Sequence, residues 1–380
     1  MSPIGSDQAG EGGVPSGDVL RPGDGRLSGY LSVFLGVMSW LAVLCFRYPS
    51  YLTTPDLRRV YDPEMLRLVL QAGMWFALGF GLLTFVLGRR KRMGAVGILF
   101  TVWAFALGGW RAEIGPLDQR STFLGLDFLL LDLLASALLF IFIEKVVPRD
   151  ADQPVLRPLW RLDLAYFALN HLLVGVVLLA GNRLAPAAFG WAVSDGVRAF
   201  VSGLPVPAQV LLLLLCADLV QYAVHRAFHE VPFLWRFHAV HHSVRHMDWL
   251  AGSRMHPVEV WTVRPLVMVP LYLLGPAEAA LDAYVVIAAL QAVFVHANVG
   301  LPFGGLRYLL VTPQFHHWHH AREPEAVNTN YCVHTPLWDW MFRSLHLPTK
   351  RWPRQYGSDT EVPPTLPGQL LFPLRGGDAD

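Results

Sequence analysis

Long apolar segments separated by short polar ones make up most of the first 300 residues. An α-helix needs about 20 mainly apolar residues to cross the hydrocarbon core of a bilayer. We therefore expect these segments to form membrane helices, the last two as a hairpin that is fully or partly inserted. They are 27–46, 68–88, 93–110, 123–143, 164–182, 199–217, 260–274 and 283–297.

The two ends of the chain have a different pattern. Residues 1–26 are rich in Gly, Ser and Pro and have no apolar period, which predicts a disordered tail. The segment 347–380 carries six prolines and predicts an irregular surface tail. Nowhere does the sequence show the alternation that is typical of strands. The pattern therefore predicts an all-α, integral-membrane helical bundle.

Composition agrees with a membrane protein and excludes some partners. Hydrophobic residues make up 53% of the chain and charged residues 16%, whereas about 25% of a soluble chain is charged. The net charge is +1, so the chain lacks the basic footprint of a nucleic-acid-binding protein. Cys45, Cys216 and Cys332 form no CxxC pair, which argues against a disulfide framework or a thiolate metal site.

The basic residues predict an orientation in the membrane. Residues 89–92 are Arg-Arg-Lys-Arg, the strongest basic cluster, and such short loops stay in the cytoplasm. Two predicted spans precede this loop, so the N-terminus also faces the cytoplasm. Four more spans return the chain to the cytoplasmic side before the first histidine cluster, and the late hairpin leaves and returns on that side. All histidine clusters are therefore expected on the cytoplasmic side.

Histidine is the residue type with the most unusual distribution. The chain has 15 histidines, and fourteen lie between His225 and His346. A spacing of three or four residues places two side chains on one face of a helix. One such pair alone occurs by chance, and a lone histidine is more often a packed or surface residue than a ligand. Three clusters with this spacing indicate a metal site: His225 and His229; His238, His241 and His242; His316, His319 and His320.

The number of histidines exceeds what one ion can bind. A single zinc ion takes about four ligands, whereas the three clusters offer eight histidines, and His296 is a ninth candidate. Two ions sharing these ligands fit better. Imidazole binds Zn, Cu, Fe and Ni, so an iron pair that reacts with O₂ fits, while composition alone leaves zinc open.

Further motifs surround these clusters. They are Asp218-Leu-Val-Gln-Tyr-Ala-Val-His225-Arg226, Leu234-Trp-Arg-Phe-His238-Ala-Val-His241-His242-Ser243, Arg254-Met-His256-Pro257, His296-Ala-Asn298, Thr312-Pro313-Gln-Phe-His316, His319-His320, Asn330-Tyr331 and Leu337-Trp338-Asp339. In order and spacing this third of the chain resembles the fatty acid hydroxylase / sterol desaturase superfamily. The resemblance implies nine ligands: His225, His229, His238, His241, His242, His296, His316, His319 and His320.

The same resemblance implies a chemistry. It implies a membrane oxidoreductase with two iron ions that uses O₂ and an external electron donor to hydroxylate or desaturate a lipid drawn from the bilayer. Sterols, fatty acyl chains and sphingolipids are the implied substrates, and zinc could replace iron in a recombinant preparation. No catalytic side chain is expected beyond the metal ligands.

A second set of residues is expected to support the ligands. Asp218 lies seven residues before His225, on the same helix face, and could orient a ligand through the second ring nitrogen. His256 precedes a proline, which favours a helix boundary. The full set of supporting candidates is Asp218, His256, Asn298, His317, Asn330, His334 and Asp339.

We expect four regions along the chain: a disordered tail at 1–26, a transmembrane region at 27–204, a fatty acid hydroxylase-like catalytic domain at 205–346 whose helical cap holds the dimetal site, and an irregular tail at 347–380.

Two other functional classes stay open. A membrane zinc hydrolase would need a carboxylate base such as that of an HExxH motif, which this chain lacks. A metal-binding protein without catalytic activity is the other.

Overall fold

The computed structural model describes residues 24–116 and 123–375, and helices dominate them. Within these ranges the β-structure consists of two isolated bridges, Pro148 with Val299 and Ala321 with Tyr356. The prediction of an all-α fold is therefore confirmed. Most of the predicted disordered tail, residues 1–23, lies outside the described residues.

The chain divides into two compact units, which are described separately. We call the first the histidine unit, because it contains Ile141–Phe167 and Phe189–Asp380, with every predicted ligand. The second, the N-terminal unit, contains Val19–Phe140 and Ala168–Ala188. Two long helices, α6 (Leu126–Val146) and α7 (Trp160–Phe189), contribute residues to both units.

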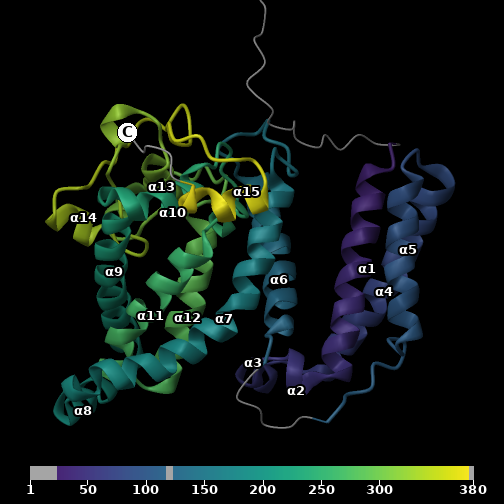
Figure 1. The fold of residues 1–380 in the computed structure, drawn as a ribbon, viewed down its shortest axis with the longest axis horizontal. Helices are drawn as coiled ribbons and strands as arrows, with labels where there is room; N and C mark the ends of the chain where they lie inside the picture. The colour runs from purple at the N-terminus through teal and green to yellow at the C-terminus, as the bar shows by residue number, and fades with distance from the viewer. Residues whose placement is uncertain (1–23, 117–122, 376–380) are drawn as a thin grey trace, which may run out of the picture. The chain divides into compact units, whose positions relative to one another are not determined.

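Three long helices pack together in the N-terminal unit (Figure 1). Asp62 caps the helix Pro63–Leu87 by accepting from the Glu64 amide at 2.9 Å. Gly97 permits the close approach of the helices Arg26–Arg47 and Lys91–Ala106, since a Cβ there would overlap Ser32 Oγ. The helices are α1 (Arg26–Arg47), α4 (Pro63–Leu87) and α5 (Lys91–Ala106), with short α2 (Pro49–Leu52) and α3 (Pro55–Val60) between the first two.

One predicted span has different bounds in the structure. The stretch 199–217 was expected to be one helix, but α8 (Asp195–Ser202) ends inside it and α9 (Val206–Glu230) begins after a break. Pro205 causes the break, because proline restricts the residue before it and donates no amide hydrogen bond. The new start carries α9 through both histidines of the first cluster.

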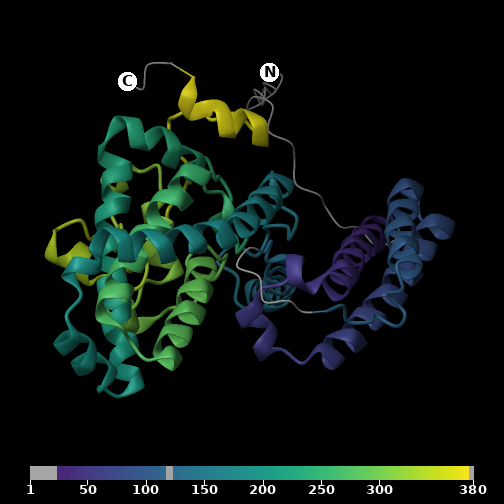
Figure 2. The same ribbon diagram turned by 60° about the horizontal axis from the view of Figure 1, so that its bottom comes forward.

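The histidine unit is built around α9, which packs against α10 (Pro232–His242), α11 (Pro257–Leu274) and α12 (Glu278–Phe294) (Figures 1 and 2). Leu213 and Ala217 of α9 contact Leu271 and Tyr284 in one buried cluster. Despite Pro265 and Pro270, α11 is continuous. It ends at Gly275, which adopts a φ of 57°.

Shorter elements close one end of this unit. The segment after 347 is largely irregular, as expected, but it is more than a surface tail, because Tyr356 and Gln369 are buried. Tyr356 is held by hydrogen bonding to His317 at 2.8 Å. The remaining helices are α13 (Pro313–His319), α14 (Leu337–Met341), α15 (Leu366–Leu371), η1 (Gly190–Ala192), η2 (Ala251–Ser253), η3 (Gly304–Tyr308), η4 (Pro324–Ala326) and η5 (Phe372–Leu374).

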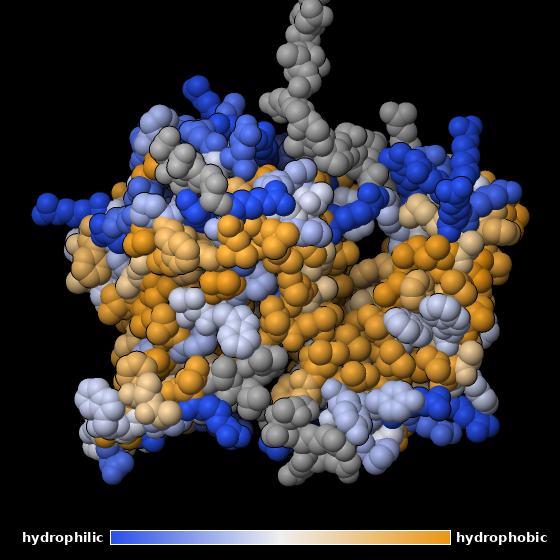
Figure 3. Space-filling model, viewed as in Figure 1, coloured by the Kyte–Doolittle hydropathy of each residue, from blue (hydrophilic) through white to orange (hydrophobic). Residues whose placement is uncertain are grey.

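Five helices of the described chain are long and apolar enough to cross a membrane: α1, α4, α6, α9 and α11. Large apolar side chains on them are exposed, as for Trp75 at 64% and Leu211 at 55%. Figure 3 shows such apolar residues over the helices of each unit, with hydrophilic residues at the helix ends. In water this exposure would be costly, whereas lipid tails cover it. The predicted bundle of membrane helices therefore agrees with the structure, although the expected segments 93–110, 164–182 and 283–297 are not among these five helices.

Candidate metal centre

Local sequence places the clustered histidines at helix ends that meet. His225 and His229 occupy the last turns of α9, which ends at Glu230. Pro232, at the first position of α10, then starts a new helix. The third cluster lies on α13, whose first turn is capped by Thr312. The connections between helices therefore bring three short polar segments to one end of the unit.

The nine predicted ligands form two groups. In each group the ligand nitrogens all lie within 4.8 Å of one another. His229 is partly buried and the other eight are buried. One group contains His225, His229, His238, His242 and His319, and the other contains His241, His296, His316 and His320.

Helix geometry explains the division. Residues four apart project most nearly in the same direction, and those three apart diverge slightly. On α10, His238 and His242 enter the five-histidine group while His241 enters the other. At α13, which ends at His319, the pair spaced by four residues enters the other group. His316 and His320 belong to the four-histidine group, and His319 belongs to the five-histidine group. Both helices therefore supply both groups.

The outer nitrogens of five ligands are fixed by acceptors. A carbonyl oxygen only accepts, so the four rings that face one carry their proton on the outer Nδ1, and an ionised Glu259 carboxylate would hold His238 in the same tautomer. Their inner Nε2 atoms then present lone pairs, as metal ligands must. The donors and acceptors are His225 to Tyr331 O at 2.8 Å, His238 to Glu259 Oε1 at 2.8 Å, His241 to Arg254 O at 3.1 Å, His296 to Ala292 O at 2.9 Å and His319 to Thr329 O at 2.8 Å.

The inner nitrogens approach one another without a proton between them. The Nε2 atoms of His241 and His296 are 3.3 Å apart, and both rings donate on their outer sides. Burial holds the pKa of His241 well below its usual range and lowers the pKa of His296 to about 4. Both rings are therefore neutral at pH 7, and two lone pairs face each other. The Nε2 atoms of His225 and His238 are similarly close, at 3.0 Å.

A cation bound by both nitrogens would turn this repulsion into attraction. Two nitrogens that are each about 2.1 Å from one metal ion lie roughly 3.0 to 3.4 Å apart at ordinary coordination angles. The observed separations of 3.0 Å for His225 with His238 and 3.3 Å for His241 with His296 fall in this range. The Nε2 atom of His229 is also buried and has no hydrogen-bonding partner among the described residues. The residues present therefore fit two metal ions.

Two predicted supporting residues act through a loop. The carbonyls of Thr329 and Tyr331, which accept from ligand histidines, belong to the loop 329–335. Asp339 accepts from the amides of Tyr331 at 2.9 Å and Cys332 at 2.8 Å. Asp218 accepts from the amides of residues 333, 334 and 335 rather than from a histidine ring, which corrects the expected contact. The two carboxylates hold the loop, and the loop orients the ligands.

Of the other supporting candidates, two lie beside the histidine groups and three contact other parts of the unit. His317 lies behind His296 and donates to its carbonyl at 3.3 Å. Asn330 has a φ of 61° and donates to Phe315 O at 2.9 Å, which ties the loop to α13. The rest contact other parts of the unit: Asn298 binds the backbone of Asp150, His256 caps α11 and reaches Leu370 O, and the ring of His334 packs near Tyr284.

Sequence reasoning missed Glu259 and the structural role of Arg254. Glu259 is the only acid in α11 and is 3% exposed. A carboxylate within an apolar helix marks a functional position, and that signal was present in the sequence. Arg254, whose carbonyl accepts from His241, is itself held by Asp163 at 2.5 Å. Asp163 is far from Arg254 in sequence, so no spacing could have revealed this pair.

The fold and the site together define a helical membrane protein with a two-part histidine centre suited to two metal ions. A sequence model of one family, described as fatty acid hydroxylase, matches residues 210–344. This segment holds all nine histidines of the two groups. This segment, about a third of the chain, is therefore similar to the fatty acid hydroxylase / sterol desaturase superfamily.

Several known proteins are similar to part of the chain. Ornithine lipid hydroxylase OlsE of Rhizobium tropici is 34% identical over 173 residues, which are 45% of this chain and 51% of the relative. Alkylglycerol monooxygenase of Danio rerio is 30% identical over 131 residues, 34% of this chain and 29% of the relative. A very-long-chain aldehyde decarbonylase of Oryza sativa subsp. indica is 32% identical over 148 residues, 36% of this chain and 23% of the relative.

The matched segment thus spans about half the length of the ornithine lipid hydroxylase and less than a third of the other two. No solved structure gives a significant match to the chain.

Proposed function

We propose that this chain is a membrane-bound, non-haem di-iron oxidoreductase that uses O₂ to hydroxylate a lipid. The observation that carries the proposal is the division of nine histidines into two groups whose inner nitrogens converge. The relatives named as a lipid hydroxylase and a monooxygenase support the choice of reaction. Desaturation of the same lipid is the related outcome that the experiment below separates.

The iron pair, when bound, would activate O₂ for oxidation of an unactivated C–H bond. The five-histidine group would hold one ion and the four-histidine group the other. The protein's own work is to fix the rings, exclude water and orient one C–H bond of the lipid. Burial of eight of the nine rings serves the second task.

The apolar exterior of α9 and α11 favours a lipid that reaches the site from the bilayer. The reaction also needs electrons from an external donor, and the basic loop at residues 89–92 favours the cytoplasmic side for the histidines. In a chain whose three native cysteines are replaced by alanine, labelling of one cysteine introduced at the exposed Lys350 with a membrane-impermeant thiol reagent tests the side. Labelling only after the membrane is opened supports a cytoplasmic location, and labelling of intact cells contradicts it.

Lipid mass spectrometry on cells that make the protein tests the reaction. Wild type is compared with His319→Ala, which removes one ligand of the five-histidine group, and with His346→Ala as a matched control outside both groups. A lipid heavier by one oxygen atom is expected in wild type and in His346→Ala cells. It should be lost in His319→Ala cells, although that variant still enters the membrane.

Other results have definite meanings. A lipid lighter by two hydrogen atoms would make the protein a desaturase. Equal amounts of product in wild-type and His319→Ala cells would sink the proposed site. A protein that binds two metal ions yet changes no lipid, even with several electron donors supplied, would contradict the proposed reaction.

A further inference from the structure

One short segment of the histidine unit runs alongside the membrane helix α9 and then turns back. We call residues 331–344 the α14 segment, because they contain α14. Its two ends meet beside the metal centre, since the Asn330 amide donates to the Ser344 carbonyl at 2.9 Å. Between these ends, the Trp338 Nε1–H donates to the carbonyl of Leu215 on α9 at 3.1 Å. Figure 1 shows α14 beside α9.

The position of Leu215 gives the depth of this contact. The helix α9 runs from Val206 to Glu230, so at 1.5 Å per residue it is about 37 Å long. Leu215 lies about 14 Å from the Val206 end. The hydrocarbon core of a bilayer is about 30 Å thick, so Leu215 is inside the core wherever the core lies within the length of α9. The Trp338 side chain therefore reaches a depth at which α9 is surrounded by lipid.

The first amides of the α14 segment all have acceptors within the protein. The amides of residues 331 and 332 donate to Asp339, and those of residues 333, 334 and 335 donate to Asp218, one turn beyond Leu215 on α9. Both carboxylates are fully buried. In water, solvent would satisfy such amides, whereas irregular backbone at membrane depth must find its partners within the protein. The two acids therefore suit a loop that water does not reach.

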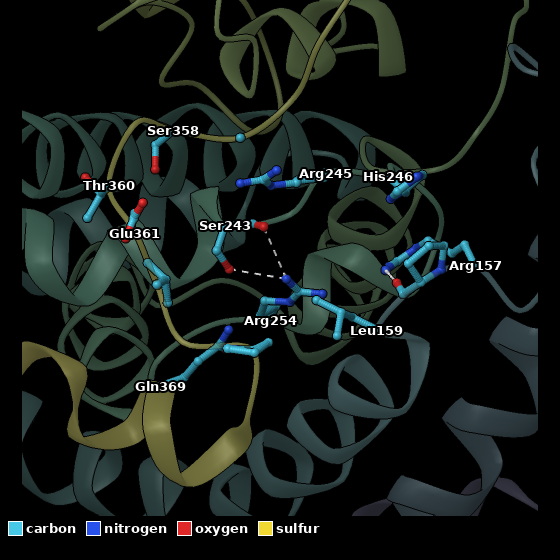
Figure 4. Close-up of a pocket in the computed structure, with 14 residues that line it drawn as sticks. Arg157, Leu159, Ser243, Arg245, His246, Arg254, Ser358, Thr360, Glu361 and Gln369 are labelled. Carbon is cyan, nitrogen blue, oxygen red and sulfur yellow. Dashed lines mark hydrogen bonds between the residues drawn. The ribbon is translucent and has the colours of Figure 1, made fainter. Parts of the chain in front are cut away.

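The exposed side chains of the α14 segment differ from those on a hydrophilic side of the same unit. Trp340, Met341 and Phe342 are consecutive and are 69%, 52% and 48% exposed. Figure 4 shows the contrast, a pocket of about 360 Å³ at the C-terminal segment whose lining includes the charged side chains of Arg245 and Glu361. Three large apolar side chains in a row would be costly in water, whereas lipid tails cover them without this cost.

The exposed charge of the α14 segment lies on its return toward the metal centre. Arg343 follows Phe342, whose ring stacks on Tyr222 of α9 at 5.2 Å between centroids. Tyr222 is seven residues beyond Leu215, which places it about 10 Å nearer the histidine end of α9. From that height an arginine can extend its guanidinium to lipid headgroups while its stem stays in the apolar layer.

A second segment extends the apolar surface. The Val311 amide donates to the carbonyl of His334, within the α14 segment, at 3.0 Å. Val311 also packs in one buried cluster with Tyr222 of α9. Leu309 and Leu310, immediately before Val311, are 66% and 52% exposed. Two irregular segments that pack on a membrane helix therefore present apolar side chains outward.

We propose that the α14 segment is a re-entrant loop that enters the hydrocarbon layer beside α9, and that lipid tails cover Trp340 and Met341. The occupant follows from continuity, since the segment is bonded to a helix whose own exposed side chains, such as Leu211, face lipid. The carbonyl of Tyr331, at the start of the segment, accepts from ligand His225. The bilayer thus supports backbone that orients a metal ligand. This inference concerns the placement of the chain in the membrane and holds whatever reaction the metal centre performs.

Fluorescence quenching tests this placement with the full-length protein in phosphatidylcholine vesicles. The three native cysteines are replaced by alanine, and one introduced cysteine carries the fluorophore NBD. The test sites are Trp340→Cys and Met341→Cys. Leu211→Cys on α9 is the lipid-facing control, and Glu361→Cys, at an exposed position beside the hydrophilic pocket, is the water-facing control. The quenchers are a nitroxide on the lipid tails and iodide in the water on both sides of the membrane.

The lipid nitroxide should quench the two test sites as strongly as Leu211→Cys and several-fold more than Glu361→Cys. Iodide should quench Glu361→Cys alone. Quenching of both test sites by iodide, to the extent seen at Glu361→Cys, would overturn the proposal. Quenching by neither agent would show that protein, such as a second copy of the chain, covers this surface, and would overturn the lipid occupant. Flotation of each variant with the vesicles verifies its insertion, and the two test sites check each other. The measurement needs neither O₂ nor turnover.

Discussion

His238 donates its outer Nδ1–H to the carboxylate of Glu259, whereas the other four fixed rings donate to backbone carbonyls. A carboxylate partner makes an imidazole a stronger ligand, because it stabilises the positive charge that the ring shares with the metal. Glu259 lies 2.8 Å from the ring and is 3% exposed, so water does not weaken the interaction. His238 is therefore the ligand whose basicity depends most on one side chain.

Substitution of Glu259 should lower metal affinity in two steps. Glu259→Gln keeps an acceptor for His238 but removes the charge, and affinity should fall roughly tenfold. Glu259→Leu removes the acceptor as well, frees the ring tautomer and should lower affinity further. Competition with a chelator on purified protein measures both, with the exposed Glu278→Gln as the control. If neither Glu259 variant releases metal more readily than the control does, the carboxylate does not support the ligand.

At the residue scale, the sequence predicted which histidines would converge but not how they would divide. Spacings of three and four both allow a shared helix face, so His238 could have joined either His241 or His242. The direction of α10 relative to α9 and α13 decides the matter, and that direction depends on packing far from the cluster. Partners such as Arg254 and the carbonyl of Thr329 were beyond prediction for the same reason.

Among the elements, the loop 329–335 orients two ligands of the five-histidine group. It makes no regular structure, yet its carbonyls accept from His225 and His319. Asn328 and Asn330 adopt φ values of 57° and 61°, a conformation that asparagine tolerates better than most residues. Carboxylates from α9 and α14 fix the loop amides, so two helices that are far apart in sequence set the orientation of two rings.

Weakening the loop should therefore affect one metal group more than the other. In Asp339→Asn only one side-chain oxygen remains to accept from the amides of Tyr331 and Cys332, and the new amide group faces one of these donors. The five-histidine group should lose metal about tenfold more readily, since His225 and His319 lose a fixed acceptor. The four-histidine group should keep its ion.

Metal retained per chain during dialysis against a chelator measures this difference. Asp282→Asn on α12 is the control, because that aspartate is exposed. Loss of both ions at the same rate in Asp339→Asn would contradict a role confined to one group.

The helices themselves could largely be predicted, because apolar runs of span length have few other structures available in a membrane. Their ends were less predictable. The start of α9 at Val206 depends on the Gly203-Leu204-Pro205 break within an otherwise apolar stretch. The C-terminal segment also differed from expectation, because the ring nitrogen of His317, more than thirty residues away in sequence, binds Tyr356 and buries it.

At the scale of the whole molecule, the fold places apolar side chains and polar rings in two different environments. Membrane helices expose apolar side chains to lipid, whereas the metal centre requires many polar rings in a dry interior. The rings are gathered at helix ends, where some backbone carbonyls have no partner within the helix. These carbonyls and those of the nearby loop accept from the outer nitrogens. Burial of so many imidazoles is tolerable only when each has a partner, and bound metal supplies the inner one.

The metal content of the purified protein tests this account most directly. Mass spectrometry of the elements in wild-type protein from iron-supplied cells should find two iron ions per chain. The paired variant His238→Ala/His319→Ala removes two ligands of the five-histidine group and should retain one ion. The paired variant His296→Ala/His316→Ala should retain the other. A single ion in the wild type, or loss of both ions in each paired variant, would contradict two separate groups, and protein that folds and oxidises lipid without iron would contradict the account as a whole.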